Sequence, residues 1–174
     1  AVGLSGKDGG LVRVRKHQGP QELGRVGHVE RIDVRLLELL EAQGYVPVIS
    51  PVGLGPDGEG YNVNAAVVAA EIARALGAQK LIFLSDVPGL LDGEDVVSEL
   101  SADQLKLKLD GQEITGGMKP KLESALAALR GGTRSVHLVD GRRQVPGDHV
   151  GQGVGAHLAG GAHPAHVEVA AAGK

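Results

Sequence analysis

Two asparagines just before a predicted helix are the side chains best suited to hold a polar ligand. The stretch Gly58-Glu-Gly-Tyr-Asn-Val-Asn64 joins an apolar run ending at Ile49 to a helical pattern starting near Ala65. The amides of Asn62 and Asn64 can each donate and accept hydrogen bonds, and both lie near the positive end of the predicted helix dipole. Asn is also a favoured N-cap residue, and spacing alone favours this simpler role for one of them.

The strands that position these side chains are predicted from short apolar runs. Residues 45–50, 80–85 and 135–139 have the composition of buried parallel strands. Residues 11–15 alternate with a period of two, which predicts a half-exposed strand, and another short strand is predicted within 27–32. The glycines and the proline between 52 and 60 predict a loop.

Helical patterns alternate with these strands. Asp33 is a candidate cap for a helix that ends near Gln43, and Gly77 follows a helix that begins at Ala65. Further helices are expected over 101–109 and from 119 or 120 to about 130, with a glycine-rich loop between them. Strand–helix–strand order favours a parallel, right-handed α/β sheet.

Composition excludes several classes of protein. The chain has 174 residues, enough for one domain with a real core. Its 18 basic and 21 acidic residues give a net charge of −3, which argues against a nucleic-acid-binding or polybasic membrane surface. It has no cysteine, hence no disulfide or thiolate chemistry. No apolar run approaches the ~20 residues of a spanning helix, and no signal segment opens the chain, so a cytoplasmic protein is expected.

Several motifs, in order, resemble those of the N-acetylglutamate kinases, within the amino-acid kinase family. They are Ala1-Val-Gly-Leu-Ser-Gly-Lys-Asp-Gly9, Gly44-Tyr-Val-Pro-Val-Ile-Ser-Pro51, Gly60-Tyr-Asn-Val-Asn-Ala65, Leu84-Ser-Asp-Val-Pro-Gly-Leu-Leu91 and Gly116-Gly-Met-Lys-Pro-Lys121. Together they cover roughly residues 1 to 142 and are more specific than any one of them. The resemblance implies a three-layer α/β sandwich with a mainly parallel, carbamate kinase-like sheet. We expect this domain over residues 1–158, with a disordered, small-residue tail over 159–174.

The resemblance also implies roles for individual residues. Lys121 matches the lysine that offsets charge on the leaving side during phosphoryl transfer, and Lys119 is its nearby alternative. Asn62 would bind the acetamido and α-carboxyl part of the substrate, and Asn64 would support that site. The residues implied to border the nucleotide are Asp86, Val87, Pro88, Gly89, Leu90, Leu91, Glu113, Ile114, Thr115 and Met118.

The reaction implied is transfer of the ATP γ-phosphoryl group to the side-chain carboxylate of N-acetyl-L-glutamate, in arginine biosynthesis. In such transfers the protein mainly supplies positioning and positive charge. Mg²⁺ would be held mainly by ATP oxygens and water, and no sequence motif predicts a protein-held metal. Members of this family commonly form homo-oligomers.

Two departures from the family pattern bear on activity. The family motif continues Asn-Ala-Asp, whereas this chain has Asn64-Ala-Ala66, so Lys121 would lack an orienting carboxylate. The family's preceding half, with its other catalytic lysine, phosphate- and substrate-binding glycine loops and substrate-binding arginine, is expected to be missing. We therefore expect little turnover by this chain alone. The alternative is a non-catalytic module that binds a nucleotide or an amino acid.

Overall fold

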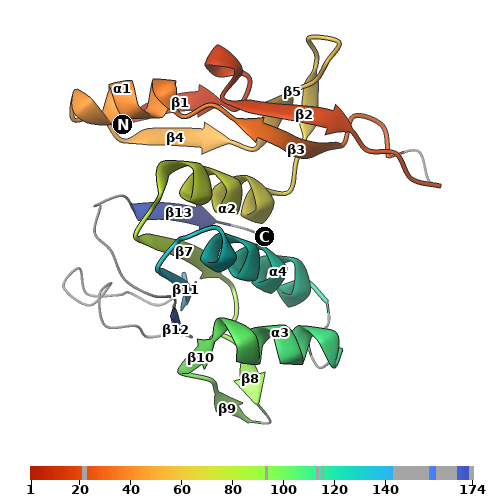
Figure 1. Ribbon diagram of the computed structural model, residues 1–174, viewed down its shortest axis with the longest axis vertical. Helices are drawn as coiled ribbons and strands as arrows, with labels where there is room; N and C mark the ends of the chain where they lie inside the picture. The colour runs from red at the N-terminus through yellow and green to blue at the C-terminus, as the bar shows by residue number, and fades with distance from the viewer. Residues whose placement is uncertain are drawn as a thin grey trace.

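Helix α2 lies between two groups of strands. The computed structural model describes residues 1–20, 23–92, 94–112, 114, 116–142, 157–159 and 168–172. In Figure 1, the strands of the first 62 residues lie above α2 (Ala65–Leu76), and the strands that follow it in sequence lie below. In the part of the chain so described, no helix is long and apolar enough to cross a membrane.

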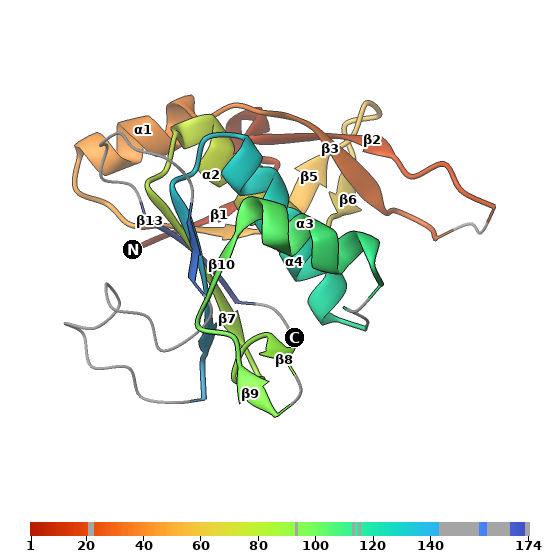
Figure 2. The same cartoon turned by 60° about the horizontal axis from the view of Figure 1, so that its bottom comes forward.

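The first group of strands forms two small sheets. Strand β1 (Val2–Ser5) pairs in parallel with β4 (Pro47–Ser50). The other sheet has the order β3-β2-β5-β6, formed by β3 (Gly27–Ile32), β2 (Val12–Lys16), β5 (Val52–Leu54) and β6 (Gly60–Asn62). A 3₁₀ turn, η1 (Asp8–Gly10), follows β1, and helix α1 (Arg35–Ala42) precedes β4. The β2–β3 pair projects away from the rest in both views (Figures 1 and 2).

The second group is a five-stranded sheet with the order β10-β12-β11-β7-β13. Its strands are β10 (Glu99–Ser101), β12 (His157–Ala159), β11 (Ser135–Asp140), β7 (Lys80–Ser85) and β13 (Glu168–Ala172). All neighbours are parallel except β11 and β12. Helices α3 (Ala102–Asp110) and α4 (Met118–Arg130) accompany it, and β8 (Leu91–Asp92) and β9 (Asp95–Val96) form a separate small hairpin. The expected α/β class with a mainly parallel sheet is confirmed.

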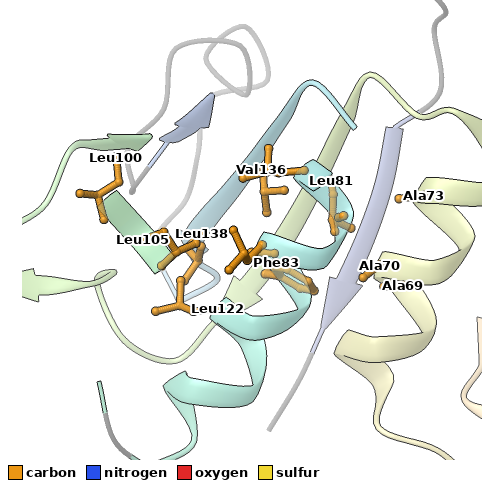
Figure 3. Close-up of a cluster of buried hydrophobic side chains, with 14 of the residues drawn as sticks. Ala69, Ala70, Ala73, Leu81, Phe83, Leu100, Leu105, Leu122, Val136 and Leu138 are labelled. Atoms are coloured by element: carbon orange, nitrogen blue, oxygen red, sulfur yellow. The ribbon is translucent and has the colours of Figure 1, made fainter. Parts of the chain in front are cut away.

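Two hydrophobic clusters form the core, and α2 contributes to both. Its buried alanines belong to one cluster with Leu81 and Phe83 of β7 and with Leu122 of α4 (Figure 3). Its other side inserts Val68 and Ile72 among the buried side chains of the first group of strands. Two faces of one helix are therefore buried, which accounts for its lack of charged residues in the first turn and its content of Ala and Val.

The ends of α2 and α3 follow from capping chemistry. The Asn64 side chain accepts hydrogen bonds from the backbone N–H groups of Ala66 and Val67, and Gly77 ends the helix in the left-handed conformation, with φ of 62°. Ser101 and Gln104 form a capping box at the start of α3. At α1 the predicted cap is shifted: Val34 is the N-cap, and Asp33 instead accepts from the backbone and guanidinium of Arg35.

The predicted loop over 52–60 is wrong in part, because it contains strand β5 and leads directly into β6. Antiparallel pairing sets Gly53 opposite Tyr61. A Cβ atom on Gly53 would lie 2.3 Å from Cγ1 of Val14, so glycine is needed here for close packing between strands. The same residue type that predicts a turn can also mark such a close approach.

Two further expectations need correction. The run 45–50 is not a strand buried on both faces: β4 begins at Pro47, and Tyr45, Val46 and Val48 are exposed. Only alternate residues of the two-stranded sheet face the packed side, which is the reason for the difference. The tail expected to be disordered contains β13, which pairs with β7, and β12 includes the first residue of that tail.

Truncating Leu122 tests whether α4 is held by the core that also holds α2. Leu122 is fully buried, so Leu122→Ala should lower the free energy of unfolding by about 2–5 kcal/mol. The matched control is Leu107→Ala on α3, where the side chain is 70% exposed and the expected change is within about 0.5 kcal/mol. Urea denaturation followed by circular dichroism measures both, and equal losses would contradict this account of the core.

Candidate functional site

The connections between helices and strands bring several polar residues to one edge of the five-stranded sheet. Helix α2 leads through a short turn into β7, and α4 leads through a short turn into β11. Strands β7 and β11 are parallel, and both helices pack on them (Figure 3). The amino ends of both helices therefore lie toward the carboxyl ends of the strands, where open α/β sheets bind ligands.

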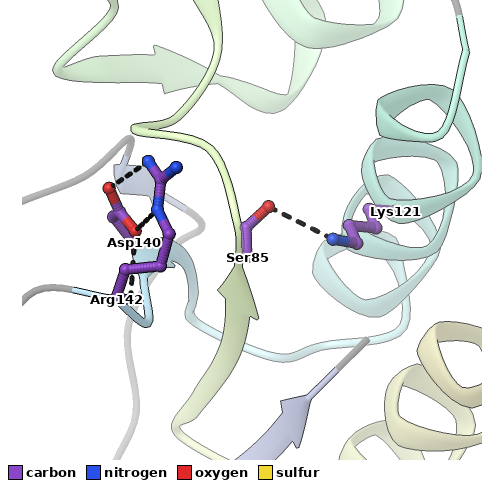
Figure 4. Close-up of polar contacts among 4 residues, drawn as sticks. All are labelled: Ser85, Lys121, Asp140 and Arg142. Carbon is purple, nitrogen blue, oxygen red and sulfur yellow. Dashed lines mark hydrogen bonds and ion pairs between the residues drawn. The ribbon is translucent and has the colours of Figure 1, made fainter. Parts of the chain in front are cut away.

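The most specific contact at this edge joins α4 to β7. Lys121, in the first turn of α4, donates a hydrogen bond from Nζ to Oγ of Ser85, at 3.2 Å (Figure 4). Ser85 is the last residue of β7 and is buried, whereas Lys121 is half-buried. The ammonium group is thus fixed at the end of the sheet.

A second cation lies on the other side of Ser85 (Figure 4). The buried Asp140 carboxylate, at the end of β11, accepts hydrogen bonds from the backbone N–H, Nε and NH2 groups of Arg142. This hydrogen-bonded carboxylate raises the pKa of Arg142, which keeps its charge at the edge of the sheet. Gly141 N donates to the Ser85 carbonyl at 2.8 Å and ties the ends of the two strands together.

The segment predicted to border a nucleotide follows Ser85 at this edge. Asp86, Val87 and Pro88 are exposed, Leu90 is buried in the core, and Leu91 is exposed and starts the β8–β9 hairpin. Gly89 is buried. The segment therefore presents a short exposed turn that is anchored by Leu90.

The glycine-rich loop before α4 is described only in part. Glu113 and Thr115 lie outside the described residues. Ile114 is buried in the core cluster, and half-buried Met118 packs against it. The backbone next to these residues is open, because a Cβ atom on Gly116 or Gly117 would meet nothing within 4 Å. The start of α4 thus has room for a ligand.

The two asparagines have different environments. Asn64 is the N-cap of α2, so its carbonyl oxygen is already engaged. Asn62 is exposed at the end of β6, and its amide makes no hydrogen bond to a described residue. Its backbone N–H donates to the Arg25 carbonyl at 2.8 Å, which fixes its position. The structure therefore leaves Asn62 as the amide able to bind a ligand with both its donor and its acceptor.

The hairpin that carries Asn62 is held by polar contacts at its turn. The hydroxyl of buried Tyr61 donates to Oδ2 of Asp57 at 3.0 Å, and Arg25 pairs with Glu59 at 3.1 Å. Burial raises the pKa of Asp57, but hydrogen bonds from the Glu59 backbone and the Tyr61 hydroxyl outweigh it and leave the pKa lowered. The same hydrogen bond raises the pKa of Tyr61. The charged side chains of the turn are therefore engaged in contacts within the protein.

Ala66 stands where the family motif has aspartate. It is half-buried and packs against the core cluster, while its backbone N–H donates to Asn64. The Lys121 amine donates instead to the hydroxyl of Ser85. The hydroxyl of Ser85 thus orients the amine without adding a negative charge.

Sequence reasoning missed Ser85 and Arg142 as parts of this edge. Ser85 closes an apolar strand and could have been found from the rule that ligands bind at the carboxyl ends of parallel strands. The Arg142 position follows from β11 lying beside β7, which sequence alone does not give.

Comparison with known proteins places the chain in a family. Residues 1–140 match the amino acid kinase family, and the chain belongs to it. It is 43% identical over 151 residues to acetylglutamate kinases of Burkholderia mallei and Burkholderia pseudomallei. That match covers 82% of this chain and 50% of the relatives, so the chain spans about half the length of the curated relatives it matches.

Solved structures show the same fold. An N-acetylglutamate synthase from Neisseria gonorrhoeae, complexed with coenzyme A and N-acetyl-glutamate, superposes with a TM-score of 0.77 at 22% identity, over 91% of this chain and 38% of that one. A carbamate kinase from Giardia lamblia, bound to AMP-PNP, gives a TM-score of 0.64 at 15% identity, over 78% and 47%. The carbamate kinase-like fold expected from the motifs is confirmed.

Replacing Tyr61 tests the hydrogen bond that supports the Asn62 hairpin. In Tyr61→Phe the pKa of Asp57 should rise, because one of the hydrogen bonds that lower it is removed. A lowered pKa in the folded state contributes stability above the unfolded value of ~3.9 that is lost as the pH falls below it. The variant should therefore lose less of its stability than the original protein on acidification from neutral pH.

NMR titration of the Asp57 carboxyl carbon measures the shift. Tyr45→Phe is the matched control, because Tyr45 is 52% exposed and lies outside the hairpin. An unchanged Asp57 pKa in Tyr61→Phe would show that the hydroxyl does not support this turn.

Proposed function

We propose that this chain forms the nucleotide-binding part and part of the substrate site of an N-acetylglutamate kinase. The reaction is transfer of the ATP γ-phosphoryl group to the side-chain carboxylate of N-acetyl-L-glutamate, with release of ADP. The observation that carries the proposal is the Lys121 ammonium held at the carboxyl edge of the sheet, beside the exposed turn after Ser85. The 43% identity to acetylglutamate kinases supports this choice of substrate.

On the nucleotide side, charge accumulates on the transferring phosphoryl group and on the oxygen that leaves with ADP. Lys121 offsets this charge, and the backbone N–H groups at the open start of α4 add partial positive charge. The exposed turn Asp86-Val-Pro88 and the segment around Met118 border the nucleotide. Mg²⁺ enters with ATP and is held by phosphate oxygens and water.

On the substrate side, the exposed Asn62 amide binds the acetamido group, which needs one donor and one acceptor. Asn64 acts indirectly, because it caps α2 and so fixes the backbone that follows Asn62. The γ-carboxylate of the substrate is then directed toward Lys121 at the start of α4. In this proposal the chain works in the cytoplasm, in arginine biosynthesis, as a monomer or homo-oligomer.

A non-catalytic binding module is the second candidate, and one observation favours it. Ala66 packs against the core where the motif calls for aspartate, and Lys121 contacts the neutral Ser85 hydroxyl. Such a site can bind a nucleotide through Lys121 and the backbone N–H groups at the start of α4, while it aligns the γ-phosphoryl group poorly with its acceptor. Loss of alignment alone lowers a rate by about two orders of magnitude.

Lys121→Ala tests the proposed nucleotide site. The variant should bind MgATP about tenfold more weakly, because a charge-assisted contact to phosphate is removed. Lys119→Ala is the matched control: Lys119 is an exposed lysine in the same helical turn and should have little effect. Isothermal titration calorimetry with MgATP measures both variants. Equal affinities for Lys121→Ala and the unaltered chain would refute the role of Lys121.

Ala66→Asp separates the two candidates. If the protein is a kinase weakened by poor alignment, Ala66→Asp in a full-length context should raise acetylglutamate-dependent ADP release at least tenfold. Ala65→Asp adds the same charge one residue earlier and serves as the control. No gain from Ala66→Asp, with MgATP binding intact, would favour the binding module.

A further inference from the structure

Lys7 lies on a turn that its own hydrogen bonds hold in place. The turn follows β1 and runs from Ser5 to Gly10. The Ser5 backbone N–H donates to Oδ2 of Asp8 at 2.8 Å, and the Lys7 N–H donates to Oγ of Ser5 at 3.3 Å. The Gly10 N–H then donates to the Lys7 carbonyl at 2.9 Å. The backbone that carries the Lys7 side chain is therefore well defined.

The side chain of Lys7 lies against the strand that ends at Asn62. A Cβ atom on Gly60 would be 3.4 Å from Cδ of Lys7, so the lysine stem covers the face of β6 on which Gly60 lies. Alternate residues of a strand share a face, and Tyr61, on the opposite face, is buried. Gly60 and exposed Asn62 therefore share the face that Lys7 covers, about 7 Å apart along the strand.

The amine of Lys7 is two bonds beyond Cδ, close enough along the chain to reach the face that Gly60 and Asn62 share. Gly60 is needed for this approach, since a side chain there would also meet Cγ1 of Val52 at 3.2 Å. A cation and an amide with both donor and acceptor are thus placed on one face of the sheet. This is the set of groups that an acylated amino acid with a free carboxylate requires.

Other charged side chains of this turn and hairpin have polar partners within the protein. Arg25 binds Glu59, Asp57 accepts from the Tyr61 hydroxyl, and Asp8 accepts from a backbone N–H. Among the residues whose placement is described, Lys7 forms neither an ion pair nor a side-chain hydrogen bond. It is half-buried, so an anion that it binds is partly shielded from water.

We infer that Lys7 is a substrate-binding residue that pairs with the α-carboxylate of the acylamino acid whose acetamido group Asn62 binds. The inference rests on the proposed function and extends it. The reacting γ-carboxylate is directed toward Lys121, so the α-carboxylate is left at the Asn62 end, where Lys7 lies.

The test compares two ligands and three variants of the whole chain by isothermal titration calorimetry at low ionic strength. The ligands are N-acetyl-L-glutamate and its α-amide, which lacks only the negative charge at the α position. Lys7→Gln should weaken binding of N-acetyl-L-glutamate about tenfold and leave binding of the α-amide nearly unchanged. Lys7→Arg keeps the charge and should bind N-acetyl-L-glutamate within about threefold of the unaltered chain.

Lys16→Gln is the matched control, since it removes one exposed lysine from the same part of the molecule and should affect neither ligand. MgADP affinity, measured on every variant, checks that the nucleotide side is intact.

Equal affinities of Lys7→Gln and Lys16→Gln for N-acetyl-L-glutamate would overturn the role of Lys7 and leave the proposed function standing. Equal weakening of both ligands by Lys7→Gln would also overturn it, because the α-carboxylate would not be the group recognised. Failure of the unaltered chain to bind N-acetyl-L-glutamate would remove the proposed substrate and the role of Lys7 together.

Discussion

The burial of α2 on two sides is the constraint on which the rest of this structure depends. Val68 and Ile72 pack into the core of the first group of strands, and Ala69, Ala70 and Ala73 pack into the core around β7. Small side chains on the second face let the helix approach the sheet closely, and each buried methyl group adds apolar area removed from water. Because both cores share one helix, the two groups of strands are held by a single rigid element.

This arrangement sets where the polar groups meet. The start of α2 is fixed by Asn64, two residues after Asn62, so the exposed Asn62 amide is tied to the same helix that packs on β7. The start of α4 brings Lys121 to Ser85 at the end of that strand. Residues separated by about sixty positions in sequence thus depend on one another through apolar packing, and the polar contacts add orientation to a position that the core has already determined.

Charges near this edge fall into two groups. Arg142 with Asp140, and Arg25 with Glu59, are paired within the protein and serve mainly to hold turns and strand ends. The amines of Lys7 and Lys121 contact no carboxylate among the described residues. In the proposed reaction both substrates are anions, so amines kept from internal carboxylates are suited to bind them.

The sequence by itself determined the helices and most strands, because periodicity and capping are local properties, and the strand–helix–strand order predicted a parallel sheet. It also supplied the motifs that identify the family and selected Asn62 and Lys121. It misread residues 52–60, because a glycine required by close packing against Val14 looks the same in sequence as a glycine in a turn. It could not pair Ser85 with Lys121, or set Lys7 beside the strand of Asn62. Those contacts join distant segments, and only the packing of the strands around α2 decides which segments meet.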